Sequence, residues 1–459
     1  MLPTFFCFWK KLPLAFHKTK QTMSKNKYLL PFALVTSLFF LWGIANSLNG
    51  VLISHFQLAL DLKRWQAGLV DSAFYFGYFV FAIPAGLFMN RFGFKKGIIL
   101  GLLLYGLGAA LFYPAAEVRV YGFFLFALFT IASGLAFLET AANPYVSILG
   151  DPAGAAQRIN FSQSFNGLSI IFGPLLGSLL IFTNNKHNAA DLAAMPIDQA
   201  EAIRIAEAQT VQMPYLALAG VVVFVALLFW LTKMPEPVQA GNEGKRGWDG
   251  IFKHRHLVLA IVAQFCYVGA QSAIFGYLID IKITLSPNDH FFVVESLKPF
   301  FEWMAGSGEE LTPQRWAGFH LTFSFILFMV GRFTGTWLMT FFDPQRLLKL
   351  FSVATVALFL VAMFTTGLTA VVVLLFTSFF MSIMFPTIFA LGTKNLGEQV
   401  KLGSSLIIMA IVGGAVLPPL FGYLSVAMGS YQAALILPLV CFTVIGIYGW
   451  KGYKVQTIN

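Results

Sequence analysis

Charged residues are scarce in this chain of 459 residues, of which 11% are Asp, Glu, Lys or Arg and 58% are hydrophobic. A soluble domain usually carries roughly a quarter charged residues. This scarcity, together with a mean hydropathy of +0.75, excludes an ordinary water-soluble domain. The net charge of +10 is spread over many separate stretches instead of one face, so we expect no nucleic-acid partner.

Cysteine is also scarce, and no pattern typical of a metal site is evident. Cys7, Cys266 and Cys441 make no disulfide framework, and the last two lie in apolar segments where a buried thiol is the simplest interpretation. His254 and His256 have no second pair of ligands nearby. A nucleophile–base pair is lacking too. We therefore predict no enzyme, no metal site and no cofactor.

The alternating strands of about ten residues that build outer-membrane barrels are absent as well. Apolar residues instead form repeated segments of about twenty, the length that an α-helix needs to cross hydrocarbon. We predict an all-α polytopic membrane protein with twelve transmembrane helices. The predicted segments are 29–54, 67–90, 96–116, 120–149, 161–183, 213–233, 257–281, 316–342, 347–366, 369–392, 403–427 and 431–450.

The longest and most charged connection on one side of the membrane, residues 234–256, divides the chain in two. It contains a Gly-Asn-Glu-Gly-Lys run of linker composition. We predict an N-terminal six-helix half over 28–233 and a C-terminal six-helix half over 257–451. An arrangement of two such halves places a solute site at their interface near the middle of the membrane.

Lys and Arg concentrate on alternate connections and at both ends of the chain. The positive-inside rule then places residues 1–27, the linker 234–256 and the tail 452–459 in the cytoplasm. Acidic residues favour the other side, where the large loops 184–212 and 282–315 fall, with a short surface helix expected between Ala190 and Gln209.

The N-terminal 22 residues have no apolar core followed by small residues, so a cleaved signal peptide is the weakest interpretation. Either translation begins at Met23, or residues 1–22 form a basic tail at the membrane surface.

Glu139 is the most informative residue, because it lies inside an apolar segment. An ionisable group at bilayer depth costs several kcal/mol at the low end of estimates, and it commonly marks the path of a polar solute. Asn143 follows one helical turn later, and Pro144 interrupts the hydrogen-bond ladder beside it.

Three other segments carry polar residues at helical spacing. A single buried amide is more often a helix–helix hydrogen bond than a ligand contact. Four segments with the same pattern, one containing a carboxylate, favour a solute cavity. Amides both donate and accept, which suits a neutral sugar, whereas an anionic substrate would require more basic residues than Arg332. The candidate substrate-binding residues are Asn46, Asn49, Glu139, Asn143, Gln163, Asn166, Gln264, Tyr267 and Gln271.

Several long stretches resemble a known family. Residues 138–145 (LETAANPY), 382–391 (SIMFPTIFAL) and 403–405 (GSS) resemble the fucose–galactose–glucose porters of the major facilitator superfamily. Residues 264–271 (QFCYVGAQ) and 331–338 (GRFTGTWL) resemble the fucose-transporting members in particular. The resemblance covers the chain from about residue 28 onward and implies the major facilitator superfamily fold.

By this resemblance Glu139 would couple proton movement to sugar binding, and Gln163 and Asn166 would line the cavity. Two departures bear on coupling and selectivity. The fucose-transporting members have an Asp where this chain has Gly50, and Gln-Tyr where it has Met384-Phe385.

Asp71 offers a second candidate for proton coupling. It lies about four residues inside the outer end of its helix, at a depth similar to that of Gly50. The outer carboxylate would then have moved from the first helix to the second. The alternative is that Asp71 caps or solvates the start of its helix.

The resemblance implies a secondary active transporter that imports a neutral monosaccharide, first of all L-fucose, by proton symport through alternating access. Two alternatives stay open: a glucose/galactose or N-acetyl amino sugar porter, in a proton- or sodium-coupled form, and a non-transporting membrane sugar sensor. We expect a monomer in the cell inner membrane with both termini in the cytoplasm. Its expected partners are the sugar, the coupling ion and the lipid bilayer.

Overall fold

The computed structural model describes residues 25–62, 66, 69–181, 192, 194–235, 248, 250–300 and 313–455. Within these residues every regular element is a helix. Eleven helical segments are long and apolar enough to cross a membrane. This result confirms the predicted all-α polytopic fold, in which each helix satisfies its own backbone hydrogen bonds. The predicted tail 1–22 and most of the predicted linker 234–256 lie outside the described residues.

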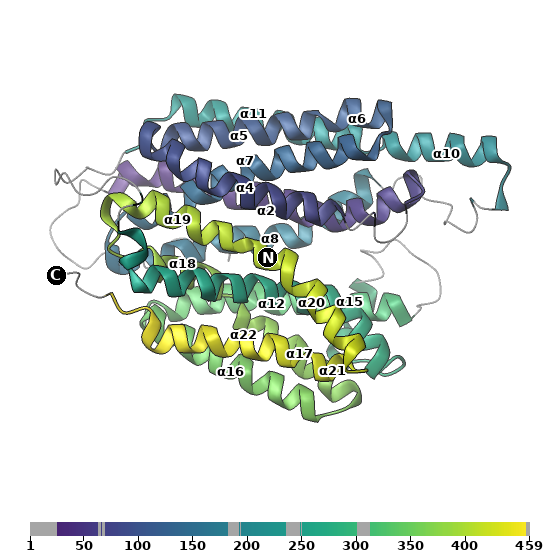
Figure 1. Cartoon of the computed structure of the whole chain (residues 1–459). Helices are drawn as coiled ribbons and strands as arrows, with labels where there is room; N and C mark the ends of the chain where they lie inside the picture. The colour runs from purple at the N-terminus through teal and green to yellow at the C-terminus, as the bar shows by residue number, and fades with distance from the viewer. Residues whose placement is uncertain are drawn as a thin grey trace.

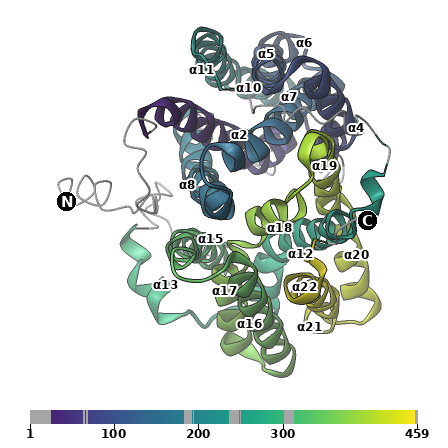
Figure 2. The same ribbon diagram turned by 90° about the vertical axis from the view of Figure 1, so that its left-hand side faces the viewer.

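The first group of helices occupies the purple-to-teal half of the molecule (Figures 1 and 2). Helix α8 corresponds to the predicted fifth segment and is 26 residues long. The group consists of α2 (Lys25–Ala59), α4 (Leu69–Phe92), α5 (Phe94–Ala110) with its extension α6 (Phe112–Val118), α7 (Tyr121–Ile148), α8 (Ala155–Leu180) and α11 (Gln212–Leu231).

The second group, green to yellow in Figure 2, faces the first across the middle of the molecule. The exact boundaries of the two halves remain a prediction. The group consists of α12 (Arg255–Leu285), α15 (Pro313–Leu338), α16 (Pro344–Phe364), α17 (Gly367–Met381), α18 (Met384–Gly392), α19 (Val400–Met409), α20 (Gly413–Ala427), α21 (Tyr431–Ala434) and α22 (Ile436–Ile447).

Local sequence explains where these helices begin and where they approach closely. Helix α16 starts after Asp343, whose backbone is extended, with Pro344 in the first helical position. Glycine permits close approach of α5 and α7, because a Cβ atom added to Gly134 would lie 2.5 Å from the carbonyl oxygen of Gly101. Such contacts replace the hydrophobic driving force that lipid does not supply.

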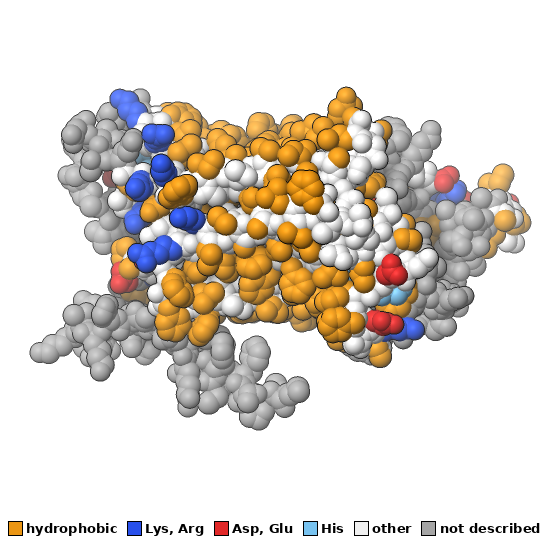
Figure 3. All heavy atoms as spheres, turned by 90° about the horizontal axis from the view of Figure 1, so that it is seen from below, with side chains coloured by type: hydrophobic (Ala, Val, Ile, Leu, Met, Phe, Trp, Pro, Cys, Tyr) orange, Lys and Arg blue, Asp and Glu red, His pale blue; other side chains and the backbone are white. Residues whose placement is uncertain are grey.

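Charges separate toward the two ends of the bundle. Figure 3 shows an apolar band between blue side chains at one end and red side chains at the other. We call the first the basic end, defined by Arg91, Lys95, Lys349, Lys401 and Lys451, and the second the acidic end, defined by Asp61, Glu117, Glu201 and Asp289.

Helix α10 (Ile197–Gln209) extends beyond the bundle at the acidic end (Figure 1). It falls within the stretch 190–209 for which a short helix is predicted. Two ion pairs attach it to the first group: Arg119 to Glu201 at 2.7 Å and Arg204 to Asp61 at 3.2 Å. Helix α13 (Phe292–Ser296) lies in the second large loop.

Candidate functional site

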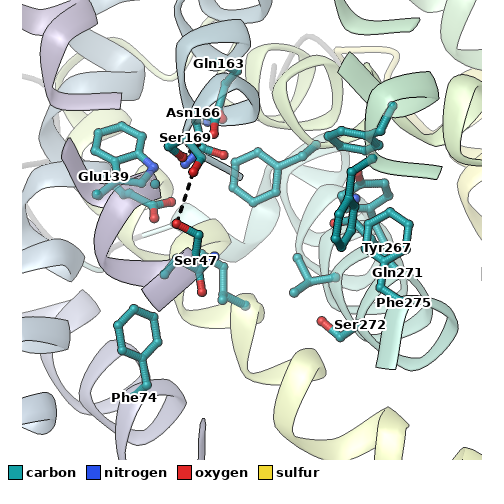
Figure 4. A pocket seen from close by; sticks show the side chains of 18 of the residues that line it. Ser47, Phe74, Glu139, Gln163, Asn166, Ser169, Tyr267, Gln271, Ser272 and Phe275 are labelled. Carbon is teal, nitrogen blue, oxygen red and sulfur yellow. Dashed lines mark hydrogen bonds between the residues drawn. The ribbon is translucent and has the colours of Figure 1, made fainter. Parts of the chain in front are cut away.

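A cavity of about 640 Å³ lies between the two groups of helices. Six helices of the first and second groups supply most of its wall, and Figure 4 shows their side chains converging from opposite sides. The cavity is lined by Trp42, Gly43, Asn46, Ser47, Phe74, Tyr75, Tyr78, Glu139, Gln163, Asn166, Ser169, Tyr267, Val268, Gln271, Ser272, Phe275, Leu321, Phe325, Phe328, Arg332, Phe385 and Ile411.

The two walls differ in chemistry. The first group contributes mainly carboxyl, amide and hydroxyl groups, with Glu139, Gln163 and Asn166 close to one another in Figure 4. The second group contributes five rings, including Phe275 and Phe385, together with the polar side chains of Gln271, Ser272 and Arg332. The first group also carries rings, at Trp42, Phe74, Tyr75 and Tyr78. A solute in the cavity would meet the carboxyl group and most of the amides on the side of the first group, and rings on both sides.

Glu139 is 6% exposed and lies in the middle of α7, so its carboxyl group has little contact with solvent. Its partner is Tyr78 of α4, whose hydroxyl donates a hydrogen bond to Glu139 Oε1 at 2.5 Å. The pair joins two helices of the first group, and both residues line the cavity. A bound solute and the carboxyl proton are therefore in the same compartment.

Asn143 lies behind this wall. Its amide nitrogen donates to the Glu139 carbonyl oxygen at 3.0 Å, and its side-chain oxygen accepts from Gln163 Nε2 at 3.3 Å. Asn143 is fully buried. It therefore positions Gln163, which reaches the cavity, instead of lining the cavity itself.

Helices α17 and α18 together form the predicted tenth segment, and the break between them borders the cavity. Pro386 has no backbone N–H, so the carbonyl of Ser382 lacks its usual helical donor. Arg332 Nε donates to that oxygen at 2.9 Å, and the Tyr267 hydroxyl donates to the carbonyl of Met381 at 3.1 Å. Two side chains of the cavity wall thus donate hydrogen bonds to backbone carbonyl groups at the break between α17 and α18.

Arg332 also connects the two groups of helices. Its Nη1 donates to the carbonyl oxygen of Gln163 in α8 at 2.7 Å. The guanidinium lies 4.6 Å from the ring centre of Phe328, and the side chain is 3% exposed. Two of its three nitrogens are engaged with backbone oxygens, so it is poorly placed to hold an anion.

Toward the basic end, the two groups are in close contact below the cavity. Asn160 Nδ2 of α8 donates to Thr387 Oγ1 of α18 at 3.2 Å. A Cβ atom added to Gly86 of α4 would lie 2.6 Å from Ser405 Oγ of α19. Lys401 lies 5.0 Å from the ring centre of Phe94. Toward the acidic end, the Tyr75 and Ser272 hydroxyls are 3.3 Å apart.

The structure brings six of the predicted site residues together on the cavity wall: Asn46, Glu139, Gln163, Asn166, Tyr267 and Gln271. Four others do not line it. Asn49 and Gln264 are buried in α2 and α12, and Asn143 supports Gln163. Asp71 lies exposed in the first turn of α4 and is not itself a lining residue, although the lining residue Tyr75 follows it one turn later.

Sequence reasoning missed the aromatic part of the wall and the partner of Glu139. The 51 Phe residues give no indication of which rings face a cavity. Tyr78 carried a usable signal, because a phenol inside an apolar segment needs a hydrogen-bond partner. Its partner is known only once α4 and α7 are placed side by side.

Comparisons with known proteins agree with this geometry. The L-fucose-proton symporter of Escherichia coli (strain K12) is 42% identical over 440 residues, which cover 94% of each chain. The L-fucose-proton symporter of Haemophilus influenzae is 36% identical, over 94% of this chain and 98% of that protein. The glucose/galactose transporter of Brucella abortus (strain 2308) is 35% identical, over 95% and 97% respectively.

Solved structures of sugar symporters are also similar to this chain. A crystal structure of the transporter FucP in the outward conformation has a TM-score of 0.82 at 41% identity and covers 94% of this chain and 100% of that one. The proton:xylose symporter XylE, at 11% identity and a TM-score of 0.71, shares the fold. The model of the Major Facilitator Superfamily matches residues 34–401. The chain therefore belongs to the major facilitator superfamily.

Proposed function

We propose that this membrane protein imports a neutral monosaccharide together with protons, with L-fucose as the first candidate. The observation that carries the proposal is the buried carboxyl group of Glu139 in the wall of a cavity that is lined by both amides and aromatic rings. The amides of Gln163 and Asn166 offer both donors and acceptors to sugar hydroxyls. The rings opposite suit the C–H face of a pyranose.

A neutral substrate fits the charges of the cavity. Arg332 is the basic residue among its lining residues, and the carbonyls of Ser382 and Gln163 occupy two of its nitrogens. An anionic sugar would also meet the carboxyl group of Glu139. Both features favour a substrate without charge.

Glu139 is the proposed coupling group. An ionised carboxylate at bilayer depth is costly, so Glu139 is expected to be protonated while the cavity is closed to water. Because the cavity opens to water on one side at a time, Glu139 would bind its proton on one side and release it on the other, together with the sugar. The hydroxyl of Tyr78 stabilises the ionised form by donating to Oε1. Protonation removes that acceptor charge, which lets the proton state influence how α4 and α7 pack.

The contacts below the cavity support a state closed at the basic end, while the Tyr75 and Ser272 hydroxyls bring the two groups within 3.3 Å of each other toward the acidic end. Asn160 and Thr387 join the two groups on the side of the basic end, which the positive-inside rule places in the cytoplasm. The related FucP structure is in the outward conformation. Import would then require these contacts to separate while the acidic end closes.

A glucose/galactose porter is the second candidate. Phe385 lies on the cavity wall where the fucose-transporting members carry a phenol, and the Brucella abortus relative is named a glucose/galactose transporter. The loss of a hydroxyl from the wall changes which sugar hydroxyls can be satisfied. A sodium-coupled version and an N-acetyl amino sugar substrate remain further variants of this candidate.

The test is uptake by purified protein in proteoliposomes. Labelled L-fucose, galactose, glucose and N-acetylglucosamine would be compared by counterflow, and each would then be driven by a proton or a sodium gradient. L-fucose counterflow and accumulation driven by protons alone would support the proposal. Counterflow of glucose or N-acetylglucosamine without competition by L-fucose would favour the second candidate, and no counterflow of any sugar would contradict both.

The proposed location is the inner membrane, as a monomer with both termini in the cytoplasm. Support comes from the basic end of the bundle, because Lys and Arg favour cytoplasmic loops. Labelling of single cysteines in residues 234–256 from outside intact cells would contradict this topology.

A further inference from the structure

Unpaired polar groups lie buried below the cavity, on the side of the basic end. Gln264 of α12 is fully buried, and neither its Oε1 nor its Nε2 has a hydrogen-bond partner among the residues that the structure describes. The same holds for Oδ1 of Asn160 in α8, whose Nδ2 is engaged with Ala156 and Thr387. A buried amide without partners is costly, because it has lost its hydrogen bonds to water.

Gln264 continues the cavity wall of the second group. It precedes Tyr267, Val268 and Gln271 at spacings of three, four and seven residues, so it lies on the same face of α12. The distance from Tyr267 along the helix is about 4.5 Å at 1.5 Å per residue. Gln264 is therefore about one turn below the cavity.

Asn160 continues the wall of the first group in the same direction. It lies three residues before Gln163, about one turn nearer the basic end. Between the two amides runs α18. Thr387 on this helix contacts Asn160, and a Cβ atom added to its Gly392 would meet Ala260 of α12, one turn from Gln264. Helix α18, which belongs to the second group, thus contacts both α8 and α12 below the cavity.

The unpaired amides have a natural use in the opposite conformation. When the basic end opens, α8 and α12 move apart with their own groups of helices, and water or a hydroxylated solute reaches the space below the cavity. The unpaired amides then destabilise the outward-facing state alone, because in the opposite state they can form hydrogen bonds to water or to the solute. Their chemistry, donor and acceptor on each side chain, matches that of the cavity wall.

We propose that Asn160 and Gln264 form a second binding station for the sugar, used only when the basic end is open, from which the sugar leaves toward the cytoplasm. The inference rests on the proposed sugar transport. The station binds hydroxyl groups of a neutral polyol and is buried in the outward-facing state. By leaving that state with unpaired amides, it also favours opening toward the cytoplasm.

The test compares the two sides of the membrane. Sugar exchange is measured in vesicles of known orientation, with sugar added either at the acidic or at the basic end. Gln264→Leu should raise the half-saturating concentration about tenfold at the basic end, the effect of one or two lost hydrogen bonds, and less than about twofold at the acidic end. Gln271→Leu, on the same helix but in the cavity wall, should raise it on both sides.

Asn160→Leu, with Asn166→Leu as its matched control, should repeat this one-sided pattern. Equal effects at the two ends, or none at either end, would overturn the proposal.

A second measurement does not depend on sugar. In a chain with Cys7, Cys266 and Cys441 replaced by alanine, Gln264→Cys should react with a membrane-impermeant thiol reagent added at the basic end and not at the acidic end. Ala127→Cys, in the buried core of α7, is the control that should react from neither. Absence of sugar exchange in the unaltered chain would contradict the proposed function, whereas absence of labelling at position 264 would contradict the second station.

Discussion

The Tyr78 hydroxyl donates a 2.5 Å hydrogen bond to Glu139 Oε1, and this bond joins α4 to α7 in the cavity wall. Both side chains are nearly inaccessible, at 3% and 6% exposure. A short bond between a phenol and a carboxyl group stabilises the ionised carboxylate. The pair therefore links the proton state of Glu139 to the packing of two helices that surround the site.

Replacing Glu139 by Gln keeps the shape and a hydrogen-bond acceptor for Tyr78 but removes the titrating proton. We expect Glu139→Gln to abolish accumulation of sugar against its gradient, because no proton is bound and released in the cycle. Exchange of labelled for unlabelled sugar should persist and lose its dependence on pH. Uptake and counterflow in proteoliposomes measure the two activities, and continued accumulation by the variant would contradict the assigned role.

Tyr78→Phe removes only the hydroxyl that Glu139 accepts from. The carboxyl group then releases its proton less readily, because the charged form has lost a hydrogen bond. Proton-driven uptake should fall about tenfold, the effect of one charge-assisted hydrogen bond, while counterflow changes little. Tyr75→Phe is the matched control, since its hydroxyl faces Ser272 instead of a carboxylate. No loss in Tyr78→Phe would show that Tyr78 acts only by packing, and equal losses in both variants would show that the effect does not depend on the bond to Glu139.

Arg332→Ala should destabilise the protein, because it leaves the carbonyls of Ser382 and Gln163 without their donors. Each unsatisfied buried oxygen costs about 1–3 kcal/mol. Arg332→Lys should recover only part of this loss. An ammonium group can donate to one of the two oxygens, but it cannot reach both as a guanidinium does. Thermal unfolding in detergent measures the effect. Arg346→Ala is the control, because Arg346 forms an exposed pair with Asp343 that contributes little; similar losses for both would contradict the bridging role.

Much of the fold was accessible from the sequence, because membrane helices leave a strong local signal. Each of the twelve predicted segments overlaps helical structure, although 96–116, 369–392, 403–427 and 431–450 are each divided between two or more consecutive helices. The fifth segment, α8, is not one of the eleven candidate spans found among the described residues. Helix α2 extends to Ala59 and α12 to Leu285, several residues beyond the predicted ends. Those ends differ because a helix continues until its backbone groups find other hydrogen-bond partners. Hydropathy does not predict the residue at which this happens. The break between α17 and α18 also lies within one apolar run.

The site was accessible only in part. Helical spacing identifies the polar face of a helix, and it correctly selected Gln163 and Tyr267 for the cavity wall. It does not show how far the cavity extends along the helices, so Gln264, one turn lower on the same face, was grouped with them. Nor does it give the partner of a side chain. The contact of Arg332 with α8 depends on the packing of two helices 169 residues apart in sequence.

The pair Met384-Phe385 at the start of α18 offers a test of selectivity. Phe385 lines the cavity, whereas Met384 is fully buried and does not. We expect Phe385→Tyr to strengthen competition by L-fucose several-fold relative to glucose, because a hydroxyl returns to the wall. Met384→Gln should mainly reduce stability, since it buries an amide. Competition of each sugar against labelled substrate measures the ratio, and an unchanged ratio in the Tyr variant would contradict a role for this position.

Asp71 was predicted as a second coupling carboxylate, and its position suggests how to decide. It is exposed in the first turn of α4 and is not a lining residue. An acidic side chain there interacts favourably with the helix dipole, typically by 0.3–1 kcal/mol. We therefore expect Asp71→Asn to change proton-driven uptake less than about twofold, in keeping with that small energy, with no effect of Gly50→Asp in the same background. A strong loss of uptake by Asp71→Asn that Gly50→Asp partly restores would instead identify Asp71 as the outer carboxylate moved from the first helix to the second.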